Sequence, residues 1–212
     1  PAFAQDQEQD TAAQSDSTIV VTGSLISNPN IERAAPVNVT SADEIDLLQS
    51  NVAEEILREI PGIVPSIGSA VNNGNGGNSF VNLRGLGSNR NVVLLDGTRL
   101  VPATLAGQFD LNNVPLALIE RVEVLTGGSS TTYGADAIAG VVNFITRQDF
   151  AGLEVNAATQ ITEEGDGHTV RLDVTTGANF DDGRGNVVLS VGYQTADPVY
   201  QGDRQIGQHV IG

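Results

Sequence analysis

The chain has 212 residues, 26 acidic against 10 basic, for a net charge of −16. All ten basic residues are arginines, and so acidic a chain argues against a nucleic-acid-binding protein, whose affinity depends on cations that neutralise phosphates. Cysteine is absent, which excludes a disulfide framework, a thiolate nucleophile and a cysteine-ligated metal, and His168 and His209 lie far from any carboxylate pair. We therefore predict no catalytic residue, no resident metal and no cofactor.

The amino end has the features of a processed, exported protein. Ala2-x-Ala4 fits the small-residue rule for signal-peptide cleavage, so we interpret the first residues as a signal-peptide remnant. The following residues are polar and acidic, with Asp6, Glu8 and Asp10 among Gln, Ser and Thr. Such a segment cannot bury enough apolar surface to offset the entropy of ordering. Residues 1–17 are therefore expected to be a remnant and a disordered acidic tail.

A β-branched segment, Thr18-Ile19-Val20-Val21-Thr22, follows this tail and stands alone before a loop rich in Asn and Pro. A single strand cannot satisfy its own backbone hydrogen-bonding groups. It therefore either joins the sheet of this domain or pairs with another chain.

Two short helices are predicted between Thr40 and Pro61. Ser41-x-x-Glu44 fits a capping box, and Asn51-x-x-Glu54 has the same form at the second helix. Apolar residues recur at helical spacing between these caps and Pro61-Gly62, which ends the second helix.

Strands alternate with turns in the region that follows. Asn72 to Ser79 is a glycine- and asparagine-rich loop that a core could not hold, and Asp96-Gly97 is typical of a hairpin turn. Together with the helices, this pattern predicts one α+β unit. Strands are expected at Phe80–Gly85, Asn91–Gly97, Glu120–Leu125 and Gly140–Thr146, and short helical segments near Leu116–Ile119 and Ala135–Ala139.

After Arg147 the pattern becomes a strict apolar/polar alternation in three segments, at about 153–161, 170–178 and 187–194. Segments of about ten residues with one apolar face are typical of transmembrane β-strands. Aromatic residues near the strand ends, Phe150, Phe180 and Tyr193, fit the girdle of such strands. An ordinary antiparallel sheet with one solvated face shows the same alternation, and periodicity alone does not separate the two.

Three motifs in order resemble one family. Asn82-Leu83-Arg84-Gly85 with Val93-Leu94-Leu95-Asp96-Gly97, the segment Ile119–Gly128, and the segment Tyr133–Asn143 are similar to signatures of the plug domain of the TonB-dependent outer-membrane receptors. The resemblance covers about residues 18–147. It implies an α+β plug domain (24–147), followed by antiparallel β-strands of a truncated transmembrane β-barrel (148–212, about three strands and a loop).

The same resemblance implies a location and partners. Residues 18–23 resemble a TonB box, with Thr18, Ile19, Val20, Val21 and Thr22 pairing with the C-terminal domain of TonB by strand addition. The protein would lie in the bacterial outer membrane, in contact with its lipid, with the plug and amino end facing the periplasm. Ligand binding outside would be coupled to exposure of the box, and import energised by the inner-membrane complex of TonB. The ligand would be a small nutrient such as a siderophore, sugar or peptide.

Two groups of residues are candidates for the working surfaces of such a plug. The alternative for the ligand-facing group is that these residues belong to ordinary solvated loops. The alternative for the plug–barrel group is that they are ordinary solvated strand residues. The ligand-facing candidates are Asn72, Asn73, Asn75, Asn78, Arg99, Gln108 and Phe109, and the candidates for polar plug–barrel contacts are Arg84, Glu120, Arg121 and Glu123.

Three strands cannot close a barrel, since receptors of this type use 22 strands around a plugged lumen. We therefore expect the chain to be the front of a longer receptor, to be completed by another chain, or to be a short periplasmic product. In the last case the alternative function is a solitary exported plug-like module that binds TonB or a ligand without transport. A hydrolase is disfavoured, because no nucleophile–base pair supports it.

Overall fold

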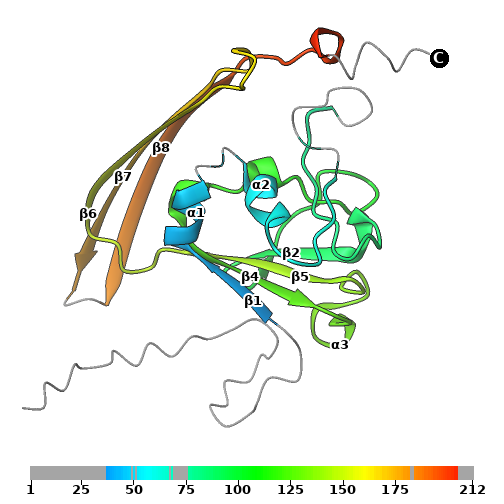
Figure 1. Cartoon of the computed structure of the whole chain (residues 1–212). Coiled ribbons are helices and arrows are strands. Elements are labelled where there is room, and N and C mark those ends of the chain that lie inside the picture. The colour runs from blue at the N-terminus through cyan, green and yellow to red at the C-terminus, as the bar shows by residue number, and fades with distance from the viewer. Residues whose placement is uncertain are drawn as a thin grey trace, which may run out of the picture.

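The computed structural model describes residues 37–48, 50, 52–66, 68, 76–181 and 184–204, which form two β-sheets with short helices between them (Figure 1). The first sheet has five strands in the order β1-β4-β5-β2-β3, and the second has three in the order β6-β7-β8. The strands are β1 (Val37–Ser41), β2 (Asn91–Leu95), β3 (Thr98–Arg99), β4 (Ile119–Thr126), β5 (Gly140–Thr146), β6 (Gly152–Gln160), β7 (Thr169–Phe180) and β8 (Gly185–Ala196).

The five-stranded sheet is mixed. β1 runs antiparallel to β4, with Val37 opposite Leu125, and β4 runs antiparallel to β5. β2 lies parallel to β5, with Asn91 opposite Gly140, and turns back into the two-residue β3. β1 and β3 are therefore the edges of this sheet, and β4, β5 and β2 form its centre.

The helices are short, and their first turns follow local rules. They are α1 (Ala42–Leu48), α2 (Ala53–Arg58) and α3 (Ser130–Tyr133), with the 3₁₀ turns η1 (Ser88–Arg90), η2 (Leu111–Asn113), η3 (Leu116–Leu118) and η4 (Gln201–Asp203). The capping box of α1 is confirmed: the Ser41 amide donates to Glu44 Oε2 at 2.9 Å, and the Glu44 amide donates to Ser41 Oγ at 3.5 Å. At α2 the N-cap is Val52, which makes no side-chain cap, and Asn51 lies outside the described residues.

Both faces of the five-stranded sheet are covered. The larger core joins Val122, Val124 and Phe144 of the sheet to apolar side chains of α2, η2 and η3. A smaller cluster on the other face joins Val92, Leu94, Leu125 and Val141 to Ala137, with Tyr133 of α3 packed against it. Burial of this apolar surface holds the short helices, which are too short to be stable alone.

Two local predictions are wrong. Phe80–Gly85 does not form a strand, because Arg84 and Gly85 adopt φ angles of +55° and +70° and turn the chain after a single bridge between Ile63 and Leu83. The segment Ala135–Ala139 is a series of turns rather than a helix, and α3 ends earlier, at Tyr133.

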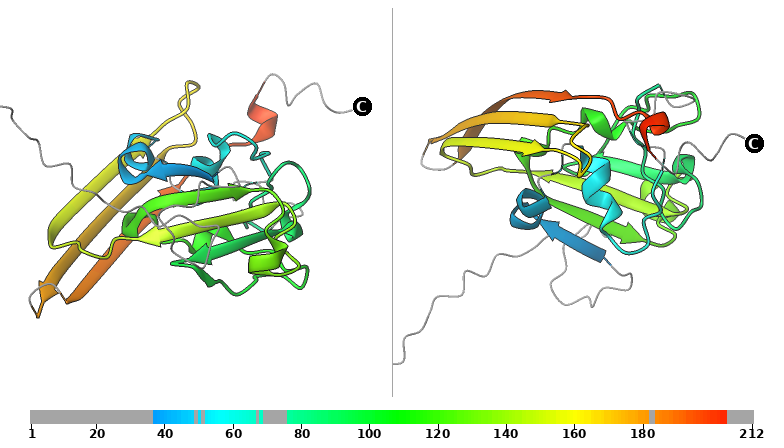
Figure 2. Two further views of the ribbon diagram at one scale, coloured as in Figure 1. Left: turned by 90° about the horizontal axis from the view of Figure 1, so that it is seen from below. Right: turned by 45° about the horizontal axis from the view of Figure 1, so that its top comes forward.

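The second sheet is an antiparallel meander that lies beyond α1 and the η2–η3 segment, as the two further views show (Figure 2). Val174 of β7 is the register partner of Val155 on β6 and of Val191 on β8, which aligns the faces of all three strands. No helix in the described part of the chain is both long and apolar enough to span a membrane.

Candidate functional site

The three-stranded sheet carries its apolar and polar side chains on the opposite faces from those of a water-soluble protein. Leu153, Val191 and Tyr193 are 71%, 65% and 66% exposed on the face turned away from the rest of the molecule. On the inward face, Asp173 and Thr175 are only 9% and 2% exposed. A half-solvated sheet in water buries its apolar face, whereas a membrane barrel turns it outward to lipid and keeps the polar face inside. The structure therefore favours the transmembrane explanation of the alternation.

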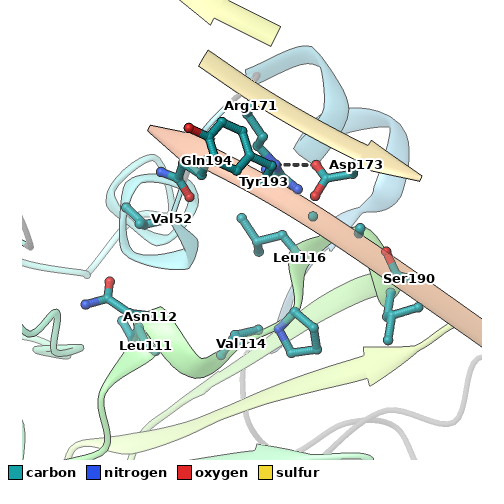
Figure 3. A pocket seen from close by; sticks show the side chains of 14 residues that line it. Val52, Leu111, Asn112, Val114, Leu116, Arg171, Asp173, Ser190, Tyr193 and Gln194 are labelled. Atoms are coloured by element: carbon teal, nitrogen blue, oxygen red, sulfur yellow. Dashed lines mark hydrogen bonds and ion pairs between the residues drawn. The ribbon is translucent and has the colours of Figure 1, made fainter. Parts of the chain in front are cut away.

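A cavity of about 470 Å³ lies between the inward face of β7–β8 and the η2–η3 segment (Figure 3). One side is apolar and comes from Leu111, Val114 and Leu116. The opposite side is polar, and Figure 3 shows the side chains of Arg171 and Asp173 on the strand side of this space. The two layers therefore meet across a partly open, mixed surface rather than through a close-packed apolar core.

Arg171 makes a direct contact across this boundary. Its Nη1 donates to the backbone carbonyl oxygen of Ser50 at 2.7 Å, and Ser50 lies between α1 and α2. Its Nε donates to Asp173 Oδ2, two residues further along the same face of β7. The arginine and aspartate side chains are both largely buried, so the ion pair is screened less than an exposed one.

A second group of charges lies beside this contact. Arg147 Nη1 pairs with Glu154 Oε2 of β6 at 2.6 Å, and the Asp46 carboxyl of α1 interacts electrostatically with this pair and with Arg171. Burial raises the pKa of the Asp46 carboxyl above its usual value, and Arg147 and Arg171 act against that rise. The end of α1 therefore faces a layer of alternating charges on the neighbouring strands.

The connection between the sheets is fixed at its start. The Arg147 amide donates to the Leu118 carbonyl oxygen at 2.9 Å, and its guanidinium lies 5.6 Å from the ring centroid of Phe150. Asn186 Nδ2 of β8 donates to the Phe150 carbonyl oxygen at 2.8 Å. These contacts set where β6 begins relative to the first sheet.

The family-like motifs of the sequence serve the five-stranded sheet. Asp96 adopts φ +49° at the hairpin, and its carboxylate accepts from both the amide and the hydroxyl of Thr146 at 2.8 Å. The Gly97 amide donates to Asn143 Oδ1 at 3.0 Å, so the Asp-Gly turn is held to β5. At Gly140, φ is +149°, and an added Cβ would lie 2.8 Å from Leu83 Cδ1 and closer still to the Leu125 carbonyl oxygen. Only glycine fits there.

The ligand-facing candidates fall in different surroundings. Asn72, Asn73 and Asn75 lie outside the described residues, and Asn78 is half-buried. Arg99 is exposed and pairs with Asp136 at 2.8 Å.

Gln108 and Phe109 have internal contacts. Gln108 is half-buried and donates to Ser88 Oγ, and Phe109 packs against the larger core. A ligand contact at any of these residues stays a prediction.

One hydrogen-bond network links the segment just before Phe80 to η2 and to Asp110, the residue that precedes it. Asp110 Oδ1 accepts from the Ser79 amide at 2.9 Å, and Asn112 Nδ2 donates to the Gly77 carbonyl oxygen at 2.8 Å. The Ser79 hydroxyl, which is fully buried, donates to Asn112 Oδ1 at 3.0 Å. The network gives this part of the loop a fixed base on η2.

The four candidates for polar contacts with a barrel lie elsewhere. Arg121 pairs with Glu120 at 2.9 Å and with the fully buried Glu123 at 3.0 Å, on the sheet face opposite η2 and η3. Arg84 donates to the Ile138 carbonyl oxygen at 3.3 Å. The described strands β6–β8 lie on the other side of the sheet, so the proposed contacts of these residues with a barrel stay a prediction.

Sequence reasoning missed Arg171 and Asp173 as interface residues. Their signal was present, because opposite charges two residues apart in a strand share one face, and here that face is the polar one. Within the described ranges no group of three or more His, Cys, Asp or Glu side chains could hold a metal ion. Residues 18–22, assigned to a TonB box, lie outside the described residues.

Comparison with known proteins identifies the first domain. A family model described as the TonB-dependent receptor plug domain matches residues 29–141, more than half of the chain. The chain belongs to this family. The plug here comprises the five-stranded sheet with its helices, and we call β6–β8 the strand wall.

Solved receptor structures match both parts together. The siderophore receptor PirA from Pseudomonas aeruginosa is 25% identical with a TM-score of 0.57, over 78% of this chain and 30% of that chain. A variant of the ferric enterobactin receptor PfeA from the same organism, in complex with enterobactin, is 25% identical with a TM-score of 0.58, over 79% and 26%. The unliganded ferric citrate transporter FecA shares the fold at 23% identity and a TM-score of 0.65, over 78% and 26%.

The chain spans between a quarter and a third of the length of these receptors. The expectation of a plug domain followed by antiparallel barrel strands is confirmed.

Proposed function

We propose that this chain is the plug and the first wall strands of a TonB-dependent outer-membrane uptake receptor. The observation that carries the proposal is the strand wall, which turns Asp173 and Thr175 toward the plug and Leu153 and Val191 away from it. Such a sheet has a stable place only where its outer face meets lipid and its inner face meets polar protein. A solitary plug-like module in water would leave this apolar face exposed, so the receptor is the better account.

The connections between wall strands support an orientation. β7 and β8 are joined across residues 181–184, whereas β6 and β7 are joined by the longer segment 161–168. Outer-membrane barrels have short turns on the periplasmic side and longer loops outside. The plug connects to β6 at the same end as the short turn, since Asn186 bonds the Phe150 carbonyl oxygen. In this proposal, the end of the wall at which the plug joins β6 therefore faces the periplasm.

On the outer side, the long connections are tied together. Arg204, which follows β8, pairs with Asp166 of the β6–β7 connection at 2.5 Å. The β6–β7 connection lies at the upper end of the wall in Figure 1. The described segments that flank residues 69–75 reach toward the same end. A ligand entering from outside would therefore meet these described plug segments together with the β6–β7 connection and the segment that follows β8.

The solved neighbours favour one class of ligand. PirA is a siderophore receptor, and the PfeA variant was solved with enterobactin, both at 25% identity to this chain. We propose a ferric siderophore or a similar metal chelate as cargo, recognised at Asn78 and the neighbouring loop residues. Binding there would bias the availability of residues 18–22 on the periplasmic side, and TonB would then drive import.

The test uses the segment that would bind TonB. Val20→Pro in the full-length protein is expected to abolish binding to the C-terminal domain of TonB, because proline removes a donor that strand pairing needs. Ala13→Pro, outside the segment, is the matched control and is expected to leave the affinity unchanged. Titration calorimetry measures both. Unchanged affinity of the Val20→Pro variant would eliminate the TonB-box assignment.

A further inference from the structure

The strand wall reaches the plug at a backbone atom. Arg171 Nη1 donates to the Ser50 carbonyl oxygen at 2.7 Å, at the connection between α1 and α2. Ser50 lies two residues beyond the end of α1, and a charged guanidinium makes a stronger hydrogen bond to a carbonyl oxygen than a neutral donor does. Because the acceptor is a backbone oxygen, the contact depends on the direction of the Arg171 guanidinium and hardly at all on the side chain at position 50.

Asp173 fixes that direction. It accepts from Arg171 Nε, which leaves Nη1 aimed at Ser50, and it is 9% exposed. A planar fork held at one nitrogen loses most of its rotational freedom, so the second hydrogen bond costs less entropy.

Gly192 of β8 makes room for this arrangement. It is the register partner of Asp173, and a Cβ added at Gly192 would overlap Asp173 Oδ1. The φ of Gly192 does not lie in the left-handed region, so its backbone would accept another residue, and the space taken by the carboxylate is what favours glycine.

We propose that Arg171 is the residue by which the wall holds the α1–α2 connection of the plug, that Asp173 is its positioning residue, and that Gly192 provides the gap that Asp173 occupies. This inference rests on the proposed receptor function. In that function the plug must rearrange during transport while the wall stays in the membrane. A single hydrogen bond from Arg171 to one backbone carbonyl oxygen is a specific contact that can break without disrupting other contacts. The Arg147–Glu154 ion pair and the Asp46 carboxyl, which interacts electrostatically with Arg171, add further charged groups near this contact.

The experiment is hydrogen exchange with mass spectrometry on the full-length protein in outer-membrane vesicles, read at the peptide Ala53–Ile60 and at β7–β8. Arg171→Ala is expected to speed exchange in Ala53–Ile60 by roughly tenfold to a hundredfold, the range set by one hydrogen bond to a charged donor. Exchange in β7–β8 is expected to change less than about twofold. A residue that merely stabilised the wall would accelerate β7–β8 as well.

Two further variants sharpen the result. Gly192→Ala is expected to speed exchange in Ala53–Ile60 by several-fold, because the added methyl group displaces Asp173. Arg184→Ala is the matched control, since Arg184 is also ion-paired, with Asp181 at 2.6 Å, at the opposite end of the same hairpin. Unchanged exchange in Arg171→Ala, or equal acceleration in the Arg184→Ala control, would overturn the proposal.

Binding of the TonB C-terminal domain to the same vesicles separates the two proposals. If wild-type protein binds TonB and the exchange rates do not respond to Arg171→Ala, this inference alone fails. If the wild-type protein does not bind TonB, the receptor function fails, whereas the exchange result still decides whether Arg171 holds the α1–α2 connection.

Discussion

Gly140→Ala should weaken the plug through two separable effects. Gly140 opens β5 with φ +149°, a region that L-residues rarely adopt, and this strain costs about 1–3 kcal/mol. Its new Cβ would lie 2.8 Å from Leu83 Cδ1, inside the 3.0 Å that real Cβ contacts respect, and nearer still to the Leu125 carbonyl oxygen. Leu83 is fully buried and the Leu125 oxygen belongs to β4, so the overlap can be relieved only if β5 moves away from β4. Overpacking of this kind costs about 1–3 kcal/mol. The expected total is about 2–6 kcal/mol.

Two neighbouring glycines provide controls that divide this cost. Gly127 has φ +126° and nothing within 4 Å of an added Cβ, so Gly127→Ala should show the conformational part alone. Gly128 has neither a left-handed φ nor a close neighbour, and Gly128→Ala should stay within about 0.5 kcal/mol of the wild type.

Native-state hydrogen exchange of β4 and β5 amides, in the full-length protein in detergent micelles, gives each free energy of opening. The expected order of destabilisation is Gly140→Ala, then Gly127→Ala, then Gly128→Ala. Equal losses at Gly140 and Gly127 would refute the argument from close approach.

Two more predictions concern the wall. Val155 faces outward near the middle of β6, so Val155→Arg should reduce the amount of folded receptor in the outer membrane, at a cost of about 2–4 kcal/mol. Asn156, the next residue, faces inward, and Asn156→Arg should be tolerated. Heat-modifiability on gels measures the folded yield of both variants, and equal yields would contradict the lipid-facing assignment of Val155. Hydrogen bonding from Thr162 and from Arg204 lowers the pKa of Asp166 below 3.8, so the stability it contributes is present above that pH and is lost as the pH falls through the lower folded value. Thermal unfolding from neutral pH to about pH 3 should show this loss, and Asp166→Asn should remove that part of the pH dependence.

Sequence reasoning succeeded where the determinant was local. The capping box of Ser41 and Glu44 and the Asp96-Gly97 turn depend on residues a few positions apart, and each formed where predicted. The alternation after Arg147 likewise fixed three strands, although periodicity could not decide between water and lipid outside them. That decision required the location of the plug, which buries Asp173 and leaves Leu153 exposed.

The failures depended on partners distant in sequence. Phe80–Gly85 has strand-like residues, yet the side chain of Asn91 bonds the Leu83 amide and the Val81 carbonyl oxygen, which replaces a strand partner. β1 went unpredicted because its pairing residues on β4 lie at least 80 positions away. The contact of Arg171 with Ser50 spans 121 positions and targets a backbone oxygen, which no side-chain pattern announces.

The placement of β1 gives the plug a direction of mechanical weakness. β1 is the described strand nearest the amino end, and it lies at the edge of the sheet. Among the described strands, its five residues pair with β4 alone. A tension applied through the amino end therefore loads these few hydrogen bonds before it reaches the ladders of β4, β5 and β2. Peeling β1 away would open the plug from its margin while leaving Val122, Val124 and Phe144 packed. In the proposed receptor, a pull on the amino end would therefore release β1 first and the central strands of the sheet later.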